Sequence, residues 1–236
     1  MSGWWTPGRR RGVEFLDEPG VPDHVRARAM TDVARSNRYF GGRRAVMRTI
    51  DVIAGALPSA GTVLDVGAGT ADITAAVKQW AQRRGRGFTT IALDRSAVLL
   101  PHPARGIPGV AADALRLPFG DASIDLVLCS QLLHHFEDAG AEQLIRELHR
   151  VARGWVIIAD LPRSRLAAAG FWLAATALRF HPITRSDGIT SVFRGFTPSH
   201  LTELVRRGSG VVPVVRRGVF WRVVAYWPHS ARPASC

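Results

Sequence analysis

The stretch Val63-Leu-Asp-Val-Gly-Ala-Gly-Thr-Ala-Asp72 decides the fold class of this chain. Its first half is apolar and has the composition of a buried strand. Gly67 and Gly69 then allow the backbone to turn sharply and a ligand to approach it closely. Residues 70–83 continue with a helical pattern. This order of strand, glycine turn and helix predicts the start of a β-α-β unit, and a tight turn without any ligand is the alternative.

Strands and helices alternate across residues 61–160, and the chain continues to two further strands separated by a short Gly-containing segment. Such alternation is typical of a parallel sheet, and the short separation is typical of an antiparallel hairpin. We therefore predict an α/β fold with a Rossmann-like, mostly parallel sheet of seven strands, an antiparallel last strand, helices on both faces and an N-terminal helical cap. The predicted strands cover residues 62–66, 89–94, 109–112, 123–129, 155–159, 211–215 and 219–226.

The chain divides into segments of different character. Residues 1–22 are rich in Gly, Pro and Arg and are expected to form a flexible arm, whereas residues 23–236 are expected to form one domain. That domain would hold a helical cap, a ligand-binding core, an apolar segment with an irregular end, and a capped helix followed by the hairpin. These four parts are residues 23–60, 61–160, 161–196 and 197–227.

The charge balance suggests a nucleic-acid or membrane partner, since 31 Lys and Arg stand against 19 Asp and Glu for a net charge of +12. Lys78 is the single lysine, however, and the arginines are spread over many segments. This pattern is typical of a coding bias, so we do not expect a nucleic-acid partner. Cys129 and Cys236 are the two cysteines, which form neither a disulfide framework nor a metal cluster and favour a reducing cytoplasm.

No segment has the length of a membrane span. The longest uncharged apolar run, residues 166–178, has 13 residues, whereas a spanning helix needs about 20. The N-terminal residues also lack the apolar region of a signal peptide. We expect a cytoplasmic protein that at most contacts a membrane from one side.

Two further motifs lie near the ends of the next predicted strands. Asp94 ends the second strand, where a carboxylate can accept hydrogen bonds from a ribose diol. The segment Ala112-Asp-Ala-Leu-Arg-Leu-Pro-Phe119 precedes the strand that contains Asp125. Together with the glycine turn, these motifs resemble class I S-adenosylmethionine-dependent methyltransferases, especially the quinone-biosynthesis-like branch that acts on small molecules.

The resemblance implies S-adenosylmethionine as the cofactor, without a metal. The glycine turn would lie under the methionine part, Asp94 would bind the ribose, Asp113 would accept from the adenine amino group, and Arg38 would meet the carboxylate. The implied cofactor-binding residues are Arg38, Asp65, Gly67, Ala68, Gly69, Asp94, Arg95, Asp113, Ala114, Ser130 and Gln131. The sequence departs from the family at Ala71, where a third glycine is common, and alanine is small enough for the same packing.

A dinucleotide-binding dehydrogenase is the nearest alternative for the glycine turn. Its fingerprint has Gly or Ala where this chain has Asp72. The phosphates of a dinucleotide would also face Asp65 and Asp72, whereas these carboxylates suit the ammonium and sulfonium groups of S-adenosylmethionine. The charges therefore favour S-adenosylmethionine independently of the resemblance.

Two adjacent histidines, His134 and His135, follow the fourth predicted strand. The carboxyl ends of strands line the ligand crevice of open α/β sheets, so either histidine could deprotonate a phenol or enol during methyl transfer. We therefore name both as candidate catalytic residues. The alternatives are a structural role at the start of the next helix, and a transfer that needs only positioning and desolvation.

The acceptor side is predicted from aromatic and arginine side chains outside the core motifs. In similar enzymes the helices before the first strand fold over the cofactor, and the segment after the fifth strand shapes the acceptor pocket. The implied substrate-binding residues are Tyr39, Phe40, Phe171, Trp172, Arg185 and Arg194. Tyr39 and Phe40 belong to residues 37–42, which are predicted to be the linker between two N-terminal helices. The alternatives are core packing of the apolar helix and a simple helix end capped by Gly41.

We therefore expect methyl transfer to a small, lipophilic aromatic or polyketide-like acceptor of secondary metabolism. O-methylation is the favoured reaction, and C-methylation is the second choice. An RNA methyltransferase is one alternative, but the fourth strand runs into Cys129-Ser-Gln-Leu132 instead of the Asn/Asp-Pro-Pro-Tyr type that acts on base amines. A non-catalytic partner protein of the same fold is the other, and the intact cofactor motifs argue against it. The pattern predicts neither the acceptor nor the oligomeric state.

Overall fold

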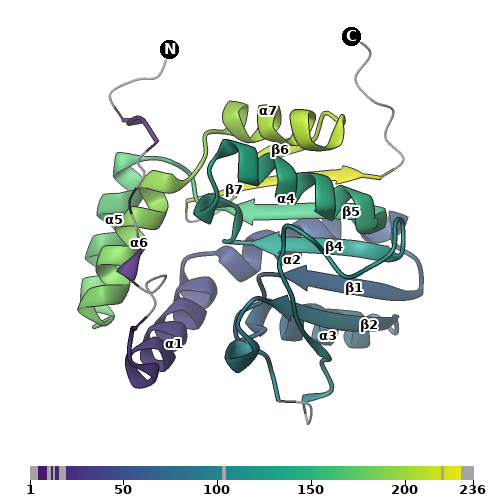
Figure 1. Cartoon of the computed structure of the whole chain (residues 1–236), viewed down its shortest axis with the longest axis horizontal. Helices are drawn as coiled ribbons and strands as arrows, with labels where there is room; N and C mark the ends of the chain where they lie inside the picture. The colour runs from purple at the N-terminus through teal and green to yellow at the C-terminus, as the bar shows by residue number, and fades with distance from the viewer. Residues whose placement is uncertain are drawn as a thin grey trace.

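The computed structural model describes residues 5–9, 12, 14–15, 20–102, 105–218 and 221–229, and for some residues of the first helix, Arg38 among them, the backbone alone. A seven-stranded sheet with the order β3-β2-β1-β4-β5-β7-β6 forms its centre (Figure 1). Strands β1 to β5 are parallel, β7 is antiparallel to β5, and β6 pairs antiparallel with β7. The predicted α/β sheet is therefore confirmed. Its strands are β1 Ala60–Val66, β2 Gly87–Asp94, β3 Gly109–Ala111, β4 Ile124–Ser130, β5 Ala152–Asp160, β6 Val214–Gly218 and β7 Arg222–Pro228.

Helices bury both faces of the sheet because each carries an apolar stripe at helical spacing. Leu144 and Leu148 of α4 and Leu201 of α7 pack into the core on one face. Ile50 of α2 and Val77 of α3 pack into the core on the other face. The helices are α1 Asp23–Tyr39, α2 Gly42–Ile53, α3 Asp72–Arg83, α4 Asp138–Val151, α5 Arg165–Ala177, α6 Pro182–Arg194 and α7 Pro198–Ser209.

A third group of helices, α1, α5 and α6, lies beyond the carboxyl ends of the parallel strands (Figure 1). Helix α6 contacts both α5 and α1, so the three form one cap over that edge. Because ligands of open α/β sheets bind outside the carboxyl ends of the strands, this cap encloses the expected site. No helix among the described residues is long and apolar enough to cross a bilayer.

Two sequence predictions about the cap were wrong. The stretch after the apolar helix is not irregular, because Pro182 starts α6 and the His181 side chain accepts a hydrogen bond from the Ile183 amide as its N-cap. Helix α1 also continues to Tyr39, so the predicted linker shrinks to Phe40 and Gly41, the latter with a φ of +78°. In both places, contacts to other elements of the cap stabilise a helix that Gly188 in α6 and Asn37 in α1 disfavour locally.

The described residues of the N-terminal segment pack on the domain, which differs from the flexible arm predicted for residues 1–22. Arg9 donates hydrogen bonds to Asp138, to the Phe136 carbonyl and to the Arg194 carbonyl. The Phe15 amide donates to Asp187, 2.9 Å away. These partners lie more than a hundred residues further along the chain, so local composition could not indicate them.

Asp125 joins three strands at the amino-terminal edge of the sheet, and its removal should be costly. Its carboxylate accepts from the Thr62 amide at 2.7 Å and from two nitrogens of Arg153 at 2.7 and 2.9 Å. Although burial raises it, these hydrogen bonds hold the pKa of Asp125 below its ordinary value. We expect Asp125→Asn to lower the free energy of unfolding by about 1–3 kcal/mol at pH 7 in urea titrations.

The pH dependence provides a control for this assignment. A depressed pKa contributes stability above the unfolded-state pKa of about 4, and this contribution is lost as the pH falls. The difference between wild type and Asp125→Asn should therefore shrink between pH 5 and pH 3. Asp121→Asn, at a carboxylate whose side chain is 80% exposed beside Arg150, should cost less than about 1 kcal/mol. A cost for Asp125→Asn that equals this control would contradict the role of Asp125.

Candidate cofactor and acceptor site

A cavity of about 610 Å³ lies between the carboxyl ends of the central strands and the helical cap. The loops after β1, β2 and β4 form one half of its wall, and α1, α5, α6 and the start of β7 form the other. This volume lies in the range of pockets that enclose a cofactor or a small ligand. Of the predicted site residues, the cavity is lined by Phe40, Gly67, Ala68, Gly69, Asp94, Arg95, Asp113, Ala114, Ser130, Gln131, His134, His135 and Phe171.

The glycine turn is held against β2 by its own backbone. The amides of Gly67 and Ala68 both donate to the Leu93 carbonyl, at 2.8 and 2.9 Å. Gly67 has a φ of +74°, and a Cβ atom there would lie 2.8 Å from the Leu132 side chain. The turn therefore needs glycine both for its backbone conformation and for the space beside it.

Asp94 couples the second strand to this turn. One carboxylate oxygen accepts from the Gly69 amide at 2.8 Å, and the other accepts from the Ser96 amide at 2.9 Å. Each oxygen keeps a further lone pair that can accept a hydroxyl, which matches the two neighbouring hydroxyls of a ribose. Asp113, on the next loop, accepts from the Leu115 amide at 2.9 Å and also faces the cavity.

Asp65 does not line the cavity, which corrects its predicted direct contact with the cofactor. Asp65 is only 2% exposed, and its Oδ2 accepts a hydrogen bond from the Thr74 hydroxyl of α3 at 2.6 Å. Burial, which is the main cause, raises the pKa of Asp65 to about 7. Since β1 side chains alternate between the two faces of the sheet, Asp65 supports the turn through α3 from one face.

Polar atoms in the wall fit a charged, amino-acid-like ligand. The Ser130 hydroxyl and Nε of Arg222 are buried and have no hydrogen-bond partner in the described part of the chain. Arg222 donates only weakly to Gln131, at 3.3 Å, and to its neighbour's carbonyl. Burial lowers the pKa of Arg222 to about 10, so it stays protonated at neutral pH. A carboxylate at this place would pair with the guanidinium, and Ser130 would supply a further hydrogen bond.

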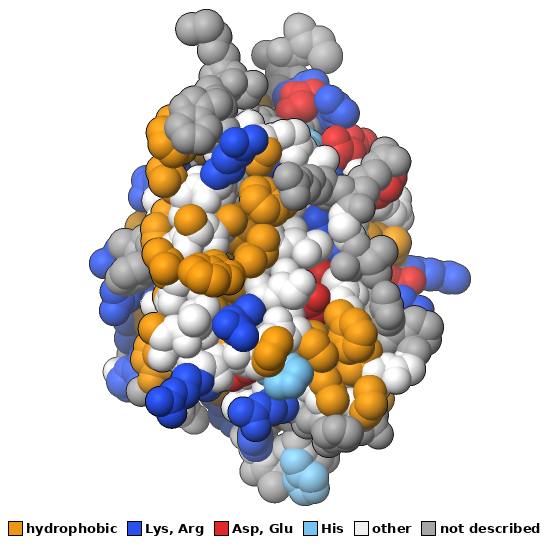
Figure 2. All heavy atoms as spheres, turned by 90° about the vertical axis from the view of Figure 1, so that its left-hand side faces the viewer, with side chains coloured by type: hydrophobic (Ala, Val, Ile, Leu, Met, Phe, Trp, Pro, Cys, Tyr) orange, Lys and Arg blue, Asp and Glu red, His pale blue; other side chains and the backbone are white. Residues whose placement is uncertain are grey.

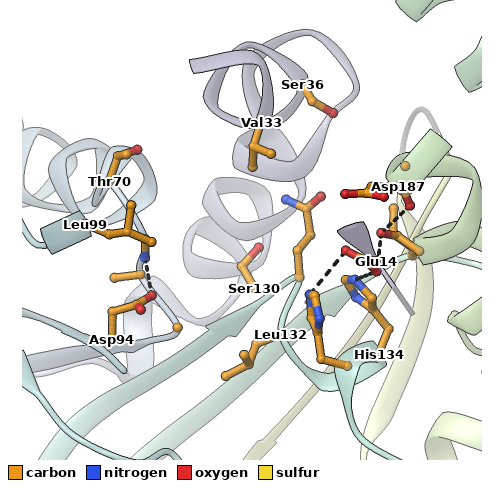
Figure 3. Close-up of a pocket in the computed structure, with 18 of the residues that line it drawn as sticks. Glu14, Val33, Ser36, Thr70, Asp94, Leu99, Ser130, Leu132, His134 and Asp187 are labelled. Carbon is orange, nitrogen blue, oxygen red and sulfur yellow. Dashed lines mark hydrogen bonds and ion pairs between the residues drawn. The ribbon is translucent and has the colours of Figure 1, made fainter. Parts of the chain in front are cut away.

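His134, labelled in Figure 3, is placed and oriented by the buried carboxylate of Asp160. Its Nδ1 lies 2.7 Å from Asp160, whose other oxygen accepts from the His134 amide at 3.2 Å. Although burial raises it, the neighbouring His134 holds the pKa of Asp160 below its ordinary value. Because a carboxylate only accepts, the neutral ring carries its proton on Nδ1 and presents the lone pair of Nε2. This is the arrangement of an oriented general base.

Glu14 enters the same place from the N-terminal segment, as Figure 3 shows. Its carboxylate lies 3.7 Å from Nε2 of His134 and 4.0 Å from Nε2 of His135. The Ser191 hydroxyl donates to it at 2.7 Å, and Arg194 lies 3.3 Å away. Glu14 and the two histidines offer ligand atoms within 4.8 Å of one another, a spacing that could hold a metal ion, although the Arg194 guanidinium already supplies a positive charge there.

Several predicted residues lie outside the cavity. Tyr39 is 51% exposed on α1. Trp172 and Arg185 line a separate shallow groove, because one step along α5 turns Trp172 about 100° away from the inward Phe171. Arg194 supports the site from behind, donating to the carbonyls of His134 and His135. The side chain of Arg38, predicted to meet the cofactor carboxylate, lies outside the described residues.

Sequence reasoning missed three residues of this site. Asp160 ends the fifth predicted strand, and the rule that strand ends line the crevice could have found it. Arg222 stands among apolar residues at the start of β7, where only the sheet order brings it beside Gln131. Glu14 lies in a segment whose composition indicated no structure, so no local signal pointed to it.

Comparison with known proteins assigns this geometry to a class. Residues 64–158 match the family model described as methyltransferase domain. This part of the chain is a class I methyltransferase domain. Its matched residues contain the glycine turn, Asp94, Asp113 and the histidine pair. S-adenosylmethionine is the cofactor of this class. Asp72 and Asp94 in the cavity wall fit its positive charges, and the buried Arg222 of β7, which lies beyond the matched residues, fits its carboxylate.

The related sequences agree with this assignment. The chain is 35% identical over 132 residues to demethylmenaquinone methyltransferase of Roseiflexus sp. strain RS-1, which covers 53% of this chain and 54% of that protein. It is 36% identical over 117 residues to demethylmenaquinone methyltransferase of Mycobacterium tuberculosis strain H37Rv, covering 49% of this chain and 43% of that protein. The chain thus spans about half the length of the curated relatives it matches.

Solved structures share the fold of the methyltransferase domain. A putative O-methyltransferase from Nostoc punctiforme PCC 73102 aligns with a TM-score of 0.60 at 18% identity, over 93% of this chain and 64% of that chain. Magnesium protoporphyrin IX methyltransferase from Synechocystis PCC 6803, solved with bound S-adenosylmethionine, aligns with a TM-score of 0.52 at 14% identity, over 92% and 89%. At these identities the likeness establishes the fold.

Proposed function

We propose that this protein transfers the methyl group of S-adenosylmethionine to a hydroxyl, or to the adjacent ring carbon, of a small lipophilic aromatic acceptor of the quinone or phenol class. The observation that carries this proposal is the continuity of one cavity. Its acidic end fits the cofactor, and its wall also contains His134, which Asp160 orients, and the apolar ring of Phe171. The curated relatives are demethylmenaquinone methyltransferases, named for a quinone acceptor.

The residues of the cavity can carry out the proton transfer that such a reaction needs. When bound, S-adenosylmethionine supplies an electrophilic methyl group on a sulfonium centre. His134 accepts the proton of the acceptor hydroxyl at Nε2, and Asp160 stabilises the protonated ring through Nδ1. The acceptor oxygen would then form the bond to the methyl carbon as the bond from that carbon to sulfur breaks. The electron pair of the broken bond stays on sulfur, so the cation is neutralised. Where the neighbouring ring carbon attacks instead, that carbon would afterwards lose its own proton and the acceptor oxygen would regain one, which restores the aromatic ring.

We assign to Arg222 the role that the sequence predicted for Arg38, which is to bind the carboxylate of S-adenosylmethionine. Its buried guanidinium, next to Gln131 and Ser130, is placed to bind the carboxylate of the cofactor. We expect Arg222→Gln to weaken S-adenosylmethionine binding about 10-fold to 100-fold in calorimetric titrations, because a charge-assisted hydrogen bond is lost. Binding of 5′-methylthioadenosine, which lacks the carboxylate, should be unchanged.

The matched control is Arg217→Gln, at an exposed arginine of the neighbouring strand β6. It should leave the binding of both ligands unaltered. Equal losses of affinity for S-adenosylmethionine and 5′-methylthioadenosine in Arg222→Gln would contradict the carboxylate assignment and point to a general disturbance of the site.

The experiment that tests the proposed function follows a labelled methyl group. The protein is incubated with S-adenosylmethionine carrying a labelled methyl and with hydroxynaphthoquinones, phenols or RNA in separate reactions. We expect labelled product from an aromatic hydroxyl compound, together with an equal amount of S-adenosylhomocysteine. Label that appears only in RNA, or in none of the acceptors, would contradict the proposal.

A further inference from the structure

Helix α5 carries an apolar face that the domain does not bury. Leu166, Ala169 and Leu173 follow one another at helical spacing and are exposed, Leu166 to 55% and Leu173 to 62%. Trp172, on the same helix, is 48% exposed. Single exposed apolar residues are common on protein surfaces, whereas a continuous apolar stripe on the outside of a helix indicates a contact with something other than this chain.

Two tryptophans from other segments extend this surface. The ring of Trp221, 44% exposed, packs over Gly170, where a Cβ atom would lie 2.3 Å from it. Trp5, 46% exposed, lies at the start of α5, where its carbonyl accepts from the Arg165 amide at 3.0 Å. We call the surface formed by Leu166, Trp172, Leu173, Trp5 and Trp221 the α5 face. Figure 2 shows hydrophobic side chains as a broad band on this side of the molecule, with arginine or lysine side chains beside it.

The exposed charged side chains of the α5 segment are positive. Residues 161–202 contain five arginines and a single acidic residue, Asp187, which is 6% exposed and accepts from the Phe15 amide. Arg165 and Arg179 are exposed at the two ends of α5. A neutral apolar partner would not need this distribution. Apolar and indole side chains surrounded by arginines match the interface of a bilayer that contains anionic lipid.

The α5 face adjoins the cavity of the methyltransferase domain. Trp221 belongs both to this face and to the cavity wall, and Phe171, the neighbour of Trp172, also lines the cavity. We propose that the protein docks on an anionic phospholipid bilayer through the α5 face, so that a lipid-dissolved acceptor enters the cavity beside Trp221. The proposed bilayer contact depends only on the residues of the α5 face. The entry of an acceptor, in contrast, rests on the proposed function.

Vesicle sedimentation tests this docking with the full chain. We expect the wild type to bind vesicles that contain phosphatidylglycerol, and to bind pure phosphatidylcholine vesicles more weakly. The double variant Trp172→Ser/Leu173→Ser should bind the anionic vesicles about 10-fold less tightly or worse, because two side chains that would enter the interface are lost. The matched control Val52→Ser/Val98→Ser changes two exposed apolar residues of other elements and should bind like the wild type.

The outcomes separate the docking from the proposed function. S-adenosylmethionine binding is measured on the same samples, and it should be equal in the wild type and both double variants. A protein that binds the cofactor but no vesicles overturns the docking alone, whereas one that binds vesicles but no cofactor overturns the proposed function alone. Equal vesicle binding by the Trp172→Ser/Leu173→Ser variant, or a dimer in solution that this variant dissolves, would also overturn the docking.

Discussion

Asp94→Ala should weaken S-adenosylmethionine binding by about 100-fold or more. The Asp94 carboxylate has a structural and a binding role. It accepts hydrogen bonds from the Gly69 amide of the turn and the Ser96 amide of its own loop, and its remaining lone pairs face the cavity. Alanine removes the acceptors for the ribose hydroxyls and leaves the Gly69 amide unpaired. Hydrogen bonds to a charged group contribute about 1.5–3 kcal/mol each, so the loss of two gives at least this factor.

Two further variants make the Asp94 result specific. Asp94→Asn keeps one acceptor oxygen and the size of the side chain, and its affinity should lie between those of wild type and Asp94→Ala. Asp51→Ala, which removes a half-exposed carboxylate from the far side of α2, should bind like wild type. Calorimetric titration measures all four proteins. Wild-type affinity in Asp94→Ala would refute the cofactor site as described.

The second large effect is expected on turnover. His134→Gln should lower kcat by about 10²-fold to 10⁴-fold, the range that a general base contributes, and leave the affinity for S-adenosylmethionine unchanged. The structure distinguishes the two predicted histidines, since it is the His134 ring that Asp160 holds at 2.7 Å. His135→Gln is therefore the matched control and should lower kcat by less than about 10-fold. Full turnover by His134→Gln would mean that positioning alone drives the reaction.

Asp160 acts through His134 as a positioning residue, and a pH profile separates this role from a structural one. A base works only when unprotonated, so kcat should fall on the acid side of its profile. Asp160→Asn removes the charge that stabilises the protonated ring, which should lower kcat and move the acid limb to lower pH. A variant that merely destabilised the fold would lower the amount of active protein at all pH values and leave the limb in place.

The sequence predicted the sheet and the cofactor loops because both depend on local patterns. An apolar run that ends in Gly67-Ala-Gly69 can hardly be anything but a strand and a turn, and Asp94 and Asp113 follow their strands directly. The predicted hairpin is present but shifted by about three residues. The sequence pattern predicts that a strand exists more reliably than it predicts where the strand begins and ends. Local signals therefore sufficed wherever the ligand contacts come from consecutive residues.

The acceptor end could not be predicted in the same way, because distant segments build it. Glu14 reaches Ser191 and Arg194 across more than 170 residues of sequence. Arg222 meets Gln131 only because β7 inserts beside β5 in the sheet order. Trp172 was misplaced because composition does not tell which side of α5 faces inward when the helix is apolar all round. Arg185 was misplaced because α6, where it lies, was not predicted as a helix.

The cavity at the carboxyl ends of the strands is the centre of this account, and a calorimetric titration of the wild-type chain with S-adenosylmethionine tests it most directly. We expect one binding site per chain, with a dissociation constant in the range of about 1 μM to 1 mM. The product S-adenosylhomocysteine should compete for the same site. No binding heat and no thermal stabilisation by either compound at millimolar concentration would contradict the account.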